Sequence, residues 1–196
     1  MHASRTIAAV TAALALALVG CSDQSSDSPE PTKKPTSSKP AASKSATPKP
    51  SPSAPMTLGD AYHSVREIDG VTYDSTSTVL AYEHDVKTSV SAEDETGASG
   101  YVWSALEIKV CMKSDGMGVS RFPWILAFAD GARVEPSGTT YGDFPKPEYP
   151  IEADVKNGDC VRGKITYAVP GDQRPTKVIY APDSLPEPVE WTMPKS

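Results

Sequence analysis

Residues 101–112 read Tyr-Val-Trp-Ser-Ala-Leu-Glu-Ile-Lys-Val-Cys-Met, and most of this stretch alternates apolar and polar side chains. Ile108 and Val110 share one parity, whereas Glu107 and Lys109 share the other. Successive side chains of a β-strand point to opposite faces of the sheet. The period of two therefore predicts a strand with one buried face and one face in water.

The same period recurs in both directions along the chain. Residues 160–169 place Ile165 and Tyr167 on the apolar parity and Arg162 and Lys164 on the polar one. The further candidate strands are residues 78–86, 124–128, 132–134, 177–180 and 189–193. No stretch shows a convincing helical period, so these short strands predict an all-β fold, an Ig-like antiparallel β-sandwich.

Two local features refine this prediction. The tripeptide Ala129-Asp130-Gly131 predicts a hairpin turn, because glycine readily supplies the positive φ that such turns need. In the strand at residues 78–86, parity places Leu80, Tyr82 and Val86 on one face.

The first 20 residues have the features of an export signal. Arg5 is the only formal charge before Cys21, and the 13 residues Ile7–Val19 are rich in Ala, Leu and Val. A spanning helix needs about 20 apolar residues, so this run fits a cleaved signal better than a permanent anchor. Residues 18–21, Leu-Val-Gly-Cys, resemble the lipobox of bacterial lipoproteins.

That resemblance implies cleavage between Gly20 and Cys21 and acylation of Cys21. We therefore expect the mature chain to be lipid-anchored at the cell membrane, on its extracytoplasmic face. The alternative is an ordinary secretory signal in which Cys21 has no lipid.

Composition changes abruptly after the predicted cleavage site. Residues 22–55 contain 8 Pro, 10 Ser and 5 Lys, and no aromatic residue, Leu, Ile, Val or Met. Such a segment cannot bury enough apolar surface to offset the entropy of ordering, so we expect residues 21–55 to be a disordered tether. It is either a simple hydrophilic spacer or a weakly basic segment that contacts anionic wall polymers or headgroups.

Residues 56–196 make one domain of ordinary size. They carry 13 Lys and Arg against 22 Asp and Glu, a formal net charge of −9. Proteins that bind nucleic acid need a basic surface for the phosphates, so we expect no nucleic-acid partner.

Cys111 and Cys160 lie on the polar parity of their strands. Exported chains meet oxidising conditions, so this pair predicts one disulfide. It should link neighbouring strands across the outer face of one sheet rather than cross the core. A redox-active pair is the alternative, although the C-x-x-C spacing typical of such pairs is absent.

The segment Cys160-Val-Arg-Gly-Lys-Ile-Thr-Tyr-Ala-Val-Pro170 resembles the G-x-hydrophobic-x-aromatic-x-hydrophobic-Pro strand of a family of bacterial Ig-like domains of unknown function. These domains commonly follow a lipoprotein signal in bacteria of the high-GC Gram-positive type, and are similar in fold to a small secreted mycobacterial antigen. The resemblance covers residues 101–193. It implies no catalytic residue, because the family has none established. The turn Ser114-Asp115-Gly116 departs from the family, which usually has Asn there.

Motifs that carry chemistry are nearly absent. The sequence has no G-x-S-x-G, S-x-x-K, phosphate-binding glycine loop or H-E-x-x-H. His63 and His84 are the only histidines of the domain, and the parity of His84 predicts a rim residue with satisfied hydrogen bonds. We expect no cofactor and no enzymatic activity.

Two loops are candidate sites. Tyr141, Phe144 and Tyr149 lie among Gly and Pro, which predicts an exposed aromatic contact surface; alternatively, the three rings cap one open end of the sandwich. The acidic run from Glu93 through Asp94 to Glu95 lies in a predicted Gly/Ser-rich loop. It is a weak candidate for Ca²⁺ because it lacks the alternating spacing of a calcium loop.

Three functions remain open. The favoured one is a non-enzymatic surface module that binds a protein or an envelope component through loops. The second is a lipoprotein that binds a small molecule or a metal ion, and the third is an enzyme on an Ig-like scaffold.

Overall fold

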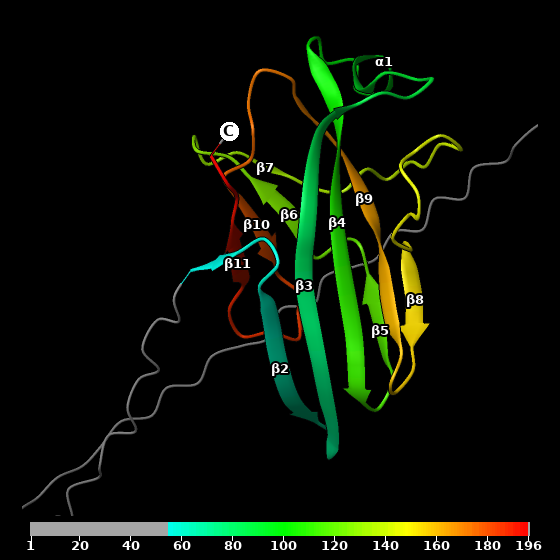
Figure 1. Cartoon of the computed structure of the whole chain (residues 1–196), viewed down its shortest axis with the longest axis vertical. Helices are drawn as coiled ribbons and strands as arrows, with labels where there is room; N and C mark the ends of the chain where they lie inside the picture. Colours follow the sequence, from blue (N-terminus) through cyan, green and yellow to red (C-terminus); the bar gives the residue numbers. More distant parts are fainter. Residues whose placement is uncertain (1–54, 196) are drawn as a thin grey trace, which may run out of the picture. The chain divides into compact units, whose positions relative to one another are not determined.

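The computed structural model describes residues 55–195, which form a β-sandwich (Figure 1). The predicted signal peptide, Cys21 and all of the tether before Pro55 lie outside the described residues. Two larger sheets run in the orders β2-β3-β4-β9 and β1-β11-β10-β6-β7, and β5 and β8 form a separate pair. The predicted all-β sandwich is confirmed.

The strands of the four-stranded sheet are β2 (Ala61–Ile68), β3 (Val71–Val86), β4 (Tyr101–Ser114) and β9 (Cys160–Pro170). Those of the five-stranded sheet are β1 (Met56–Thr57), β11 (Val189–Thr192), β10 (Lys177–Tyr180), β6 (Trp124–Ala127) and β7 (Arg133–Val134). The remaining elements are β5 (Met117–Ser120), β8 (Glu152–Val155) and one short helix, α1 (Ala92–Thr96). Within residues 55–195, no helix is long and apolar enough to cross a membrane.

The main core lies between the two larger sheets. Ile108 of β4 and Ile165 of β9 are fully buried, and so are Trp124 and Trp191 from the opposite sheet. The two indole rings lie 5.7 Å apart between centroids. Burying an apolar side chain of this kind contributes about 1.5–3 kcal/mol. The predicted alternation in β4 and β9 thus supplies one wall of this core.

The predicted β6–β7 hairpin is confirmed. Leu126 pairs with Val134, and the Phe128 amide donates to the Ala132 carbonyl at 2.9 Å. Gly131 has φ +91°, as the turn requires.

Parity is only partly as predicted in β3. The register against β4 shifts between Val79 and Ala81, so Leu80 is an extra residue in the ladder. Val79 is therefore fully buried, whereas Leu80 is only half-buried. A β-bulge exchanges the two faces of a strand, which is why the placement of Leu80 on the face of Tyr82 is wrong. A second shift, between His84 and Val86, sets Val86 opposite Trp103, and Val86 packs with Trp103 on the other face of the sheet from Tyr82, so its placement is wrong as well.

The disulfide prediction is confirmed. Cys111 lies directly opposite Cys160 in the β4–β9 ladder, their Cα atoms are 4.0 Å apart, and the sulfurs are bonded. Cys160 is exposed and Cys111 half-buried, so the bridge lies on the outer face of one sheet.

Candidate functional site

The predicted aromatic contact surface is mostly part of the interior. Phe144 is 1% exposed and Tyr149 is 0% exposed, and only Tyr141 remains half-buried. The prediction of exposed rings is therefore wrong for Phe144 and Tyr149, which cannot offer contact area to a partner.

Phe144 is buried because a second, smaller cluster forms on the outer face of β4. Trp103 projects from that face, and the Phe144 ring meets it edge-on at 5.0 Å between centroids. Tyr141 packs edge-on against Phe144 at 5.2 Å, and Ala92 of α1 completes the cluster. These rings cover Trp103, which would otherwise be exposed to water.

Tyr149 is buried because its segment pairs with the outer edge of β9. The Tyr149 amide donates to the Lys164 carbonyl at 2.9 Å, and the Lys164 amide donates to the Pro147 carbonyl at 2.8 Å. A Cβ at Gly163 would lie 2.4 Å from the Tyr149 nitrogen, so this crossing requires glycine. Buried Arg121 also donates to the Tyr149 carbonyl at 2.7 Å, which fastens the segment from the other side.

The acidic run forms helix α1 rather than a loop, with Ser91 as its N-cap. Each of its three carboxylates accepts a hydrogen bond from a separate donor: Glu93 from the Gly100 amide, Asp94 from the Ser91 hydroxyl, and Glu95 from the Tyr141 hydroxyl. The bond to Glu95 raises the pKa of Tyr141. The acidic run and Tyr141, which the sequence offered as two separate candidate sites, thus meet at one corner of the sandwich. Glu95 and Tyr141 are 46 residues apart in the sequence.

No group of three or more His, Cys, Asp or Glu side chains within residues 55–195 is placed to hold a metal ion.

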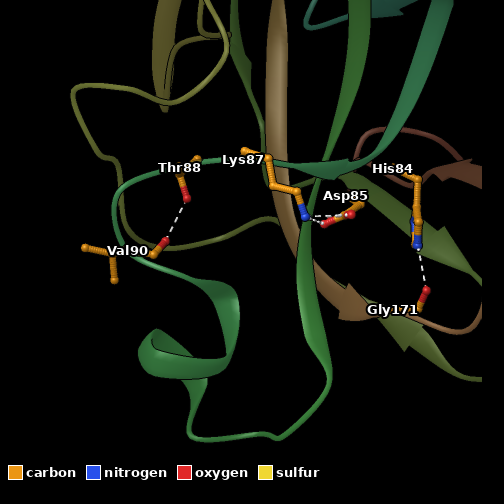
Figure 2. Close-up of polar contacts among 6 residues, drawn as sticks. All are labelled: His84, Asp85, Lys87, Thr88, Val90 and Gly171. Atoms are coloured by element: carbon orange, nitrogen blue, oxygen red, sulfur yellow. Dashed lines mark hydrogen bonds and ion pairs between the residues drawn. The ribbon is translucent and has the colours of Figure 1, made fainter.

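Each histidine of the domain has hydrogen-bond partners. His84 shares one ring nitrogen with the Tyr82 hydroxyl at 3.0 Å and the other with the Gly171 carbonyl at 3.1 Å, and Figure 2 shows the latter contact at the end of β3. The predicted rim position of His84 is confirmed. His63 lies 2.7 Å from Asp74 on the neighbouring strand. The two imidazoles therefore serve separate contacts at separate places on the four-stranded sheet.

An open sheet edge, which the sequence analysis missed, is the more distinctive feature. The two larger sheets have four edge strands, β1, β7, β9 and β2. Strands β1 and β7 have only two residues each, and the segment before Tyr149 covers the middle of the β9 edge. Strand β2 is eight residues long, and no backbone hydrogen bond joins its outer edge to any other residue that the structure describes. Figure 1 shows β2 at the free margin of its sheet.

The backbone groups on this edge can be identified. Ile68 and Val71 flank the two-residue turn Asp69-Gly70, in which both residues have positive φ. Such a turn makes the flanking pair a hydrogen-bonded pair, so the even-numbered residues of β2 bond to β3. The amides and carbonyls of the odd-numbered residues then point to the open edge.

An open groove of about 1170 Å³ lies beside β2. Ala61, Tyr62 and His63 line one side of it, and the segment from Leu185 to Glu190 lines another. Its apolar lining residues include Met56, Tyr62, Leu185, Pro186, Pro188 and Val189. Farther along the same strand, Val65 is 59% exposed, the largest value among the exposed large apolar side chains of the described region.

Comparisons with known proteins extend only to the fold. No family model matches the chain, and no curated protein sequence matches it. Among solved structures, it is similar to MPT63, a secreted protein of Mycobacterium tuberculosis, with 17% identity and a TM-score of 0.51 over 71% of this chain and 98% of that one. It also resembles the yjhA protein of Bacillus subtilis, with 11% identity and a TM-score of 0.49 over 71% and 99% of the two chains. The expected likeness in fold to a small secreted mycobacterial protein is confirmed, and at these identities it concerns the fold alone.

Proposed function

We propose that this chain is an extracytoplasmic lipoprotein whose sandwich domain binds a protein partner and catalyses no reaction. Lipidated Cys21 anchors it to the outer face of the cell membrane. The lipobox-like residues 18–21 behind a short apolar run support the anchor. The disulfide and the secretion of MPT63, which has a similar fold, support an export route.

The open edge of β2 beside the groove is the observation that carries the binding function. An extended segment that pairs with a sheet edge gains main-chain hydrogen bonds, and neighbouring pockets for its side chains give specificity. Strand β2 offers both features, because its odd-numbered backbone groups bond to no other residue that the structure describes and the apolar groove adjoins its first three residues. We therefore propose the edge of β2, instead of the aromatic loop, as the binding surface.

The distribution of polar groups also favours binding over turnover. A catalytic site needs a nucleophile or base that converges with other groups on a substrate. His63 and His84 are instead engaged in separate hydrogen bonds. His63 shares the groove beside β2 with Lys177 and Glu190, but Lys177 and Glu190 pair with each other at 2.6 Å and His63 bonds to Asp74, so these three groups already have protein partners. The net charge of −9 for residues 56–196 argues against a nucleic-acid partner.

The anchor is tested by detergent partition of cells that produce either the wild-type chain or Cys21→Ala. We expect the wild-type chain in the detergent phase and the variant in the aqueous phase or unprocessed. Stable retention needs at least two acyl chains, so intact-mass analysis should show them on Cys21. A mature chain that starts elsewhere and carries no lipid would refute the anchor.

The binding surface is tested by amide hydrogen exchange on the lipid-free chain, with and without a detergent extract of the cell envelope. The amides of His63, Val65 and Glu67 should exchange rapidly in dilute protein, because they point to the open edge, and should become protected in the extract. Protection confined to α1 and Tyr141 would return the site to the acidic corner and refute the assignment to β2.

A further inference from the structure

We propose that the partner at the open edge is a second copy of this chain, with the two β2 strands paired antiparallel around a two-fold axis at Val65. This inference rests on the proposed binding function of the edge and names its partner.

The register follows from the faces of the strand. Both sheets of the pair must keep their solvent faces on the same side, so residues that face each other across the axis must share parity. With Val65 opposite Val65 of the second copy, every odd-numbered residue meets an odd-numbered one. The free amides and carbonyls of both edges then match, and the ladder continues without a break.

The solvent face is self-complementary in this register. Val65, which is 59% exposed, would lie against its own copy at the axis. On either side, His63 would lie opposite Glu67 of the second copy. Its Nε2 already lies 2.7 Å from Asp74, so the ring would stand between two carboxylates, to which an imidazolium donates from Nε2 and Nδ1. Directly opposed side chains lie about 4.5–5.5 Å apart between Cβ atoms, so these contacts are direct. The two-fold axis makes the His63–Glu67 contact twice and the Val65 contact once.

The inner face is complementary as well. At the tip of the hairpin, Ile68 is 40% exposed and Val71 is 38% exposed. The register places Ile68 opposite Tyr62 of the second copy, and Tyr62 lines the groove. The apolar hairpin tip of each copy would therefore meet the apolar groove of the other copy, and each would shield the other from water.

Two features favour a second copy over a strand of another protein: the residues of the β2 edge, and the fact that such pairing stops at two copies. Natural edge strands are usually protected by Lys, Pro, a bulge or a short length. Strand β2 has eight residues, neither Lys nor Pro, and an unbroken register against β3. Its two charged residues do not block this pairing: the Arg66 guanidinium is held on the inner side, where it donates to the Met117 sulfur, and Glu67 would lie opposite His63 of the second copy. Pairing of two β2 edges would leave the covered β9 edges at both ends of the combined sheet. Assembly would then stop at two copies and would not continue into a fibre.

The test is thiol cross-linking on intact cells that produce the full chain with Val65→Cys. Cys111 and Cys160 are bonded to each other, and an acylated Cys21 has no free thiol, so a short bis-maleimide reports the new cysteine alone. We expect a homodimer joined between the two copies of residue 65, identified by mass spectrometry. Its yield should be several-fold above that of Ala129→Cys, an exposed position in the β6–β7 turn.

A second pair of variants tests the register. Co-produced His63→Cys and Glu67→Cys chains should cross-link to each other. Adding Val65→Lys to both chains should lower that yield several-fold, because like charges would meet at the axis. Val65→Thr, which keeps the branched shape without charge, should not.

The outcomes separate the two proposals. Links from residue 65 to a different protein would overturn the second copy and leave the binding function at the edge intact. Links no more frequent than those from Ala129→Cys, together with no link between positions 63 and 67, would overturn both.

Discussion

Replacing Phe144 with alanine tests whether the aromatic loop belongs to the interior. The side chain is 1% exposed and packs edge-on against Trp103 and Tyr141. The substitution removes the ring from a small cluster on the outer face of β4 and opens Trp103 to water. A contact surface would tolerate this loss, whereas a packed cluster would not.

The expected cost follows from the burial. Phe→Ala at a fully buried site costs about 3–5 kcal/mol of unfolding free energy. The cluster lies at the end of the sandwich and can partly collapse, so we expect the lower end of that range. For a domain near 150 residues, each 1 kcal/mol shifts the thermal midpoint by about 2–4 °C, which predicts a fall of about 10 °C.

Phe122 supplies a matched control, because it is a phenylalanine that is 50% exposed. Phe122→Ala should lower the free energy of unfolding by less than about 1 kcal/mol, as surface changes usually do. Chemical denaturation of both variants gives the comparison directly. Equal, small losses for Phe144→Ala and Phe122→Ala, with reduced partner capture for the former, would refute the assignment of Phe144 to the core.

Three further predictions follow from the disulfide, an acid and the buried tyrosines. The double substitution Cys111→Ala with Cys160→Ala removes a bridge between residues 49 apart in the sequence. It should lower the free energy of unfolding by about 4 kcal/mol in the chain-entropy model, as measured by urea unfolding, and an unchanged midpoint would contradict this. The hydrogen bond from the Ser89 amide lowers the pKa of Asp143. This bond therefore stabilises the fold fully above a pH of about 4, and the stabilisation is lost as the pH falls through the lowered pKa. Asp143→Asn should therefore flatten the acid limb of the stability curve, and an unchanged limb would exclude this bond as a contributor. Burial raises the pKa of Tyr82 and of three other tyrosines, so stability should be full below a pH of about 10 and fall above it, with tyrosinate absorbance from these residues appearing mainly on unfolding. The three are Tyr149, Tyr167 and Tyr180.

Sequence reasoning identified the elements that bury a regular apolar face. In β4 and β9 the alternation is continuous, and the polar parity of Cys111 and Cys160 was enough to predict a bridge on the outer face. It missed β2 and the first half of β3 because their inward positions are mainly small and polar, such as Ser64, Ser75 and Ser77. The Asp69-Gly70 dipeptide, a strong hairpin signal, could have revealed this pair.

By itself, then, the sequence determined the all-β class, the disulfide and most strands, since these depend on periodicity and on residue type within short windows. Only the tertiary structure decided what lies inside and what stays open. Phe144 and Tyr149 look exposed in a loop rich in Gly and Pro, but distant Trp103 and the edge of β9 bury them. The open edge of β2 was equally hidden, because whether a strand has a neighbour depends on where the rest of the chain passes, and no local pattern records that.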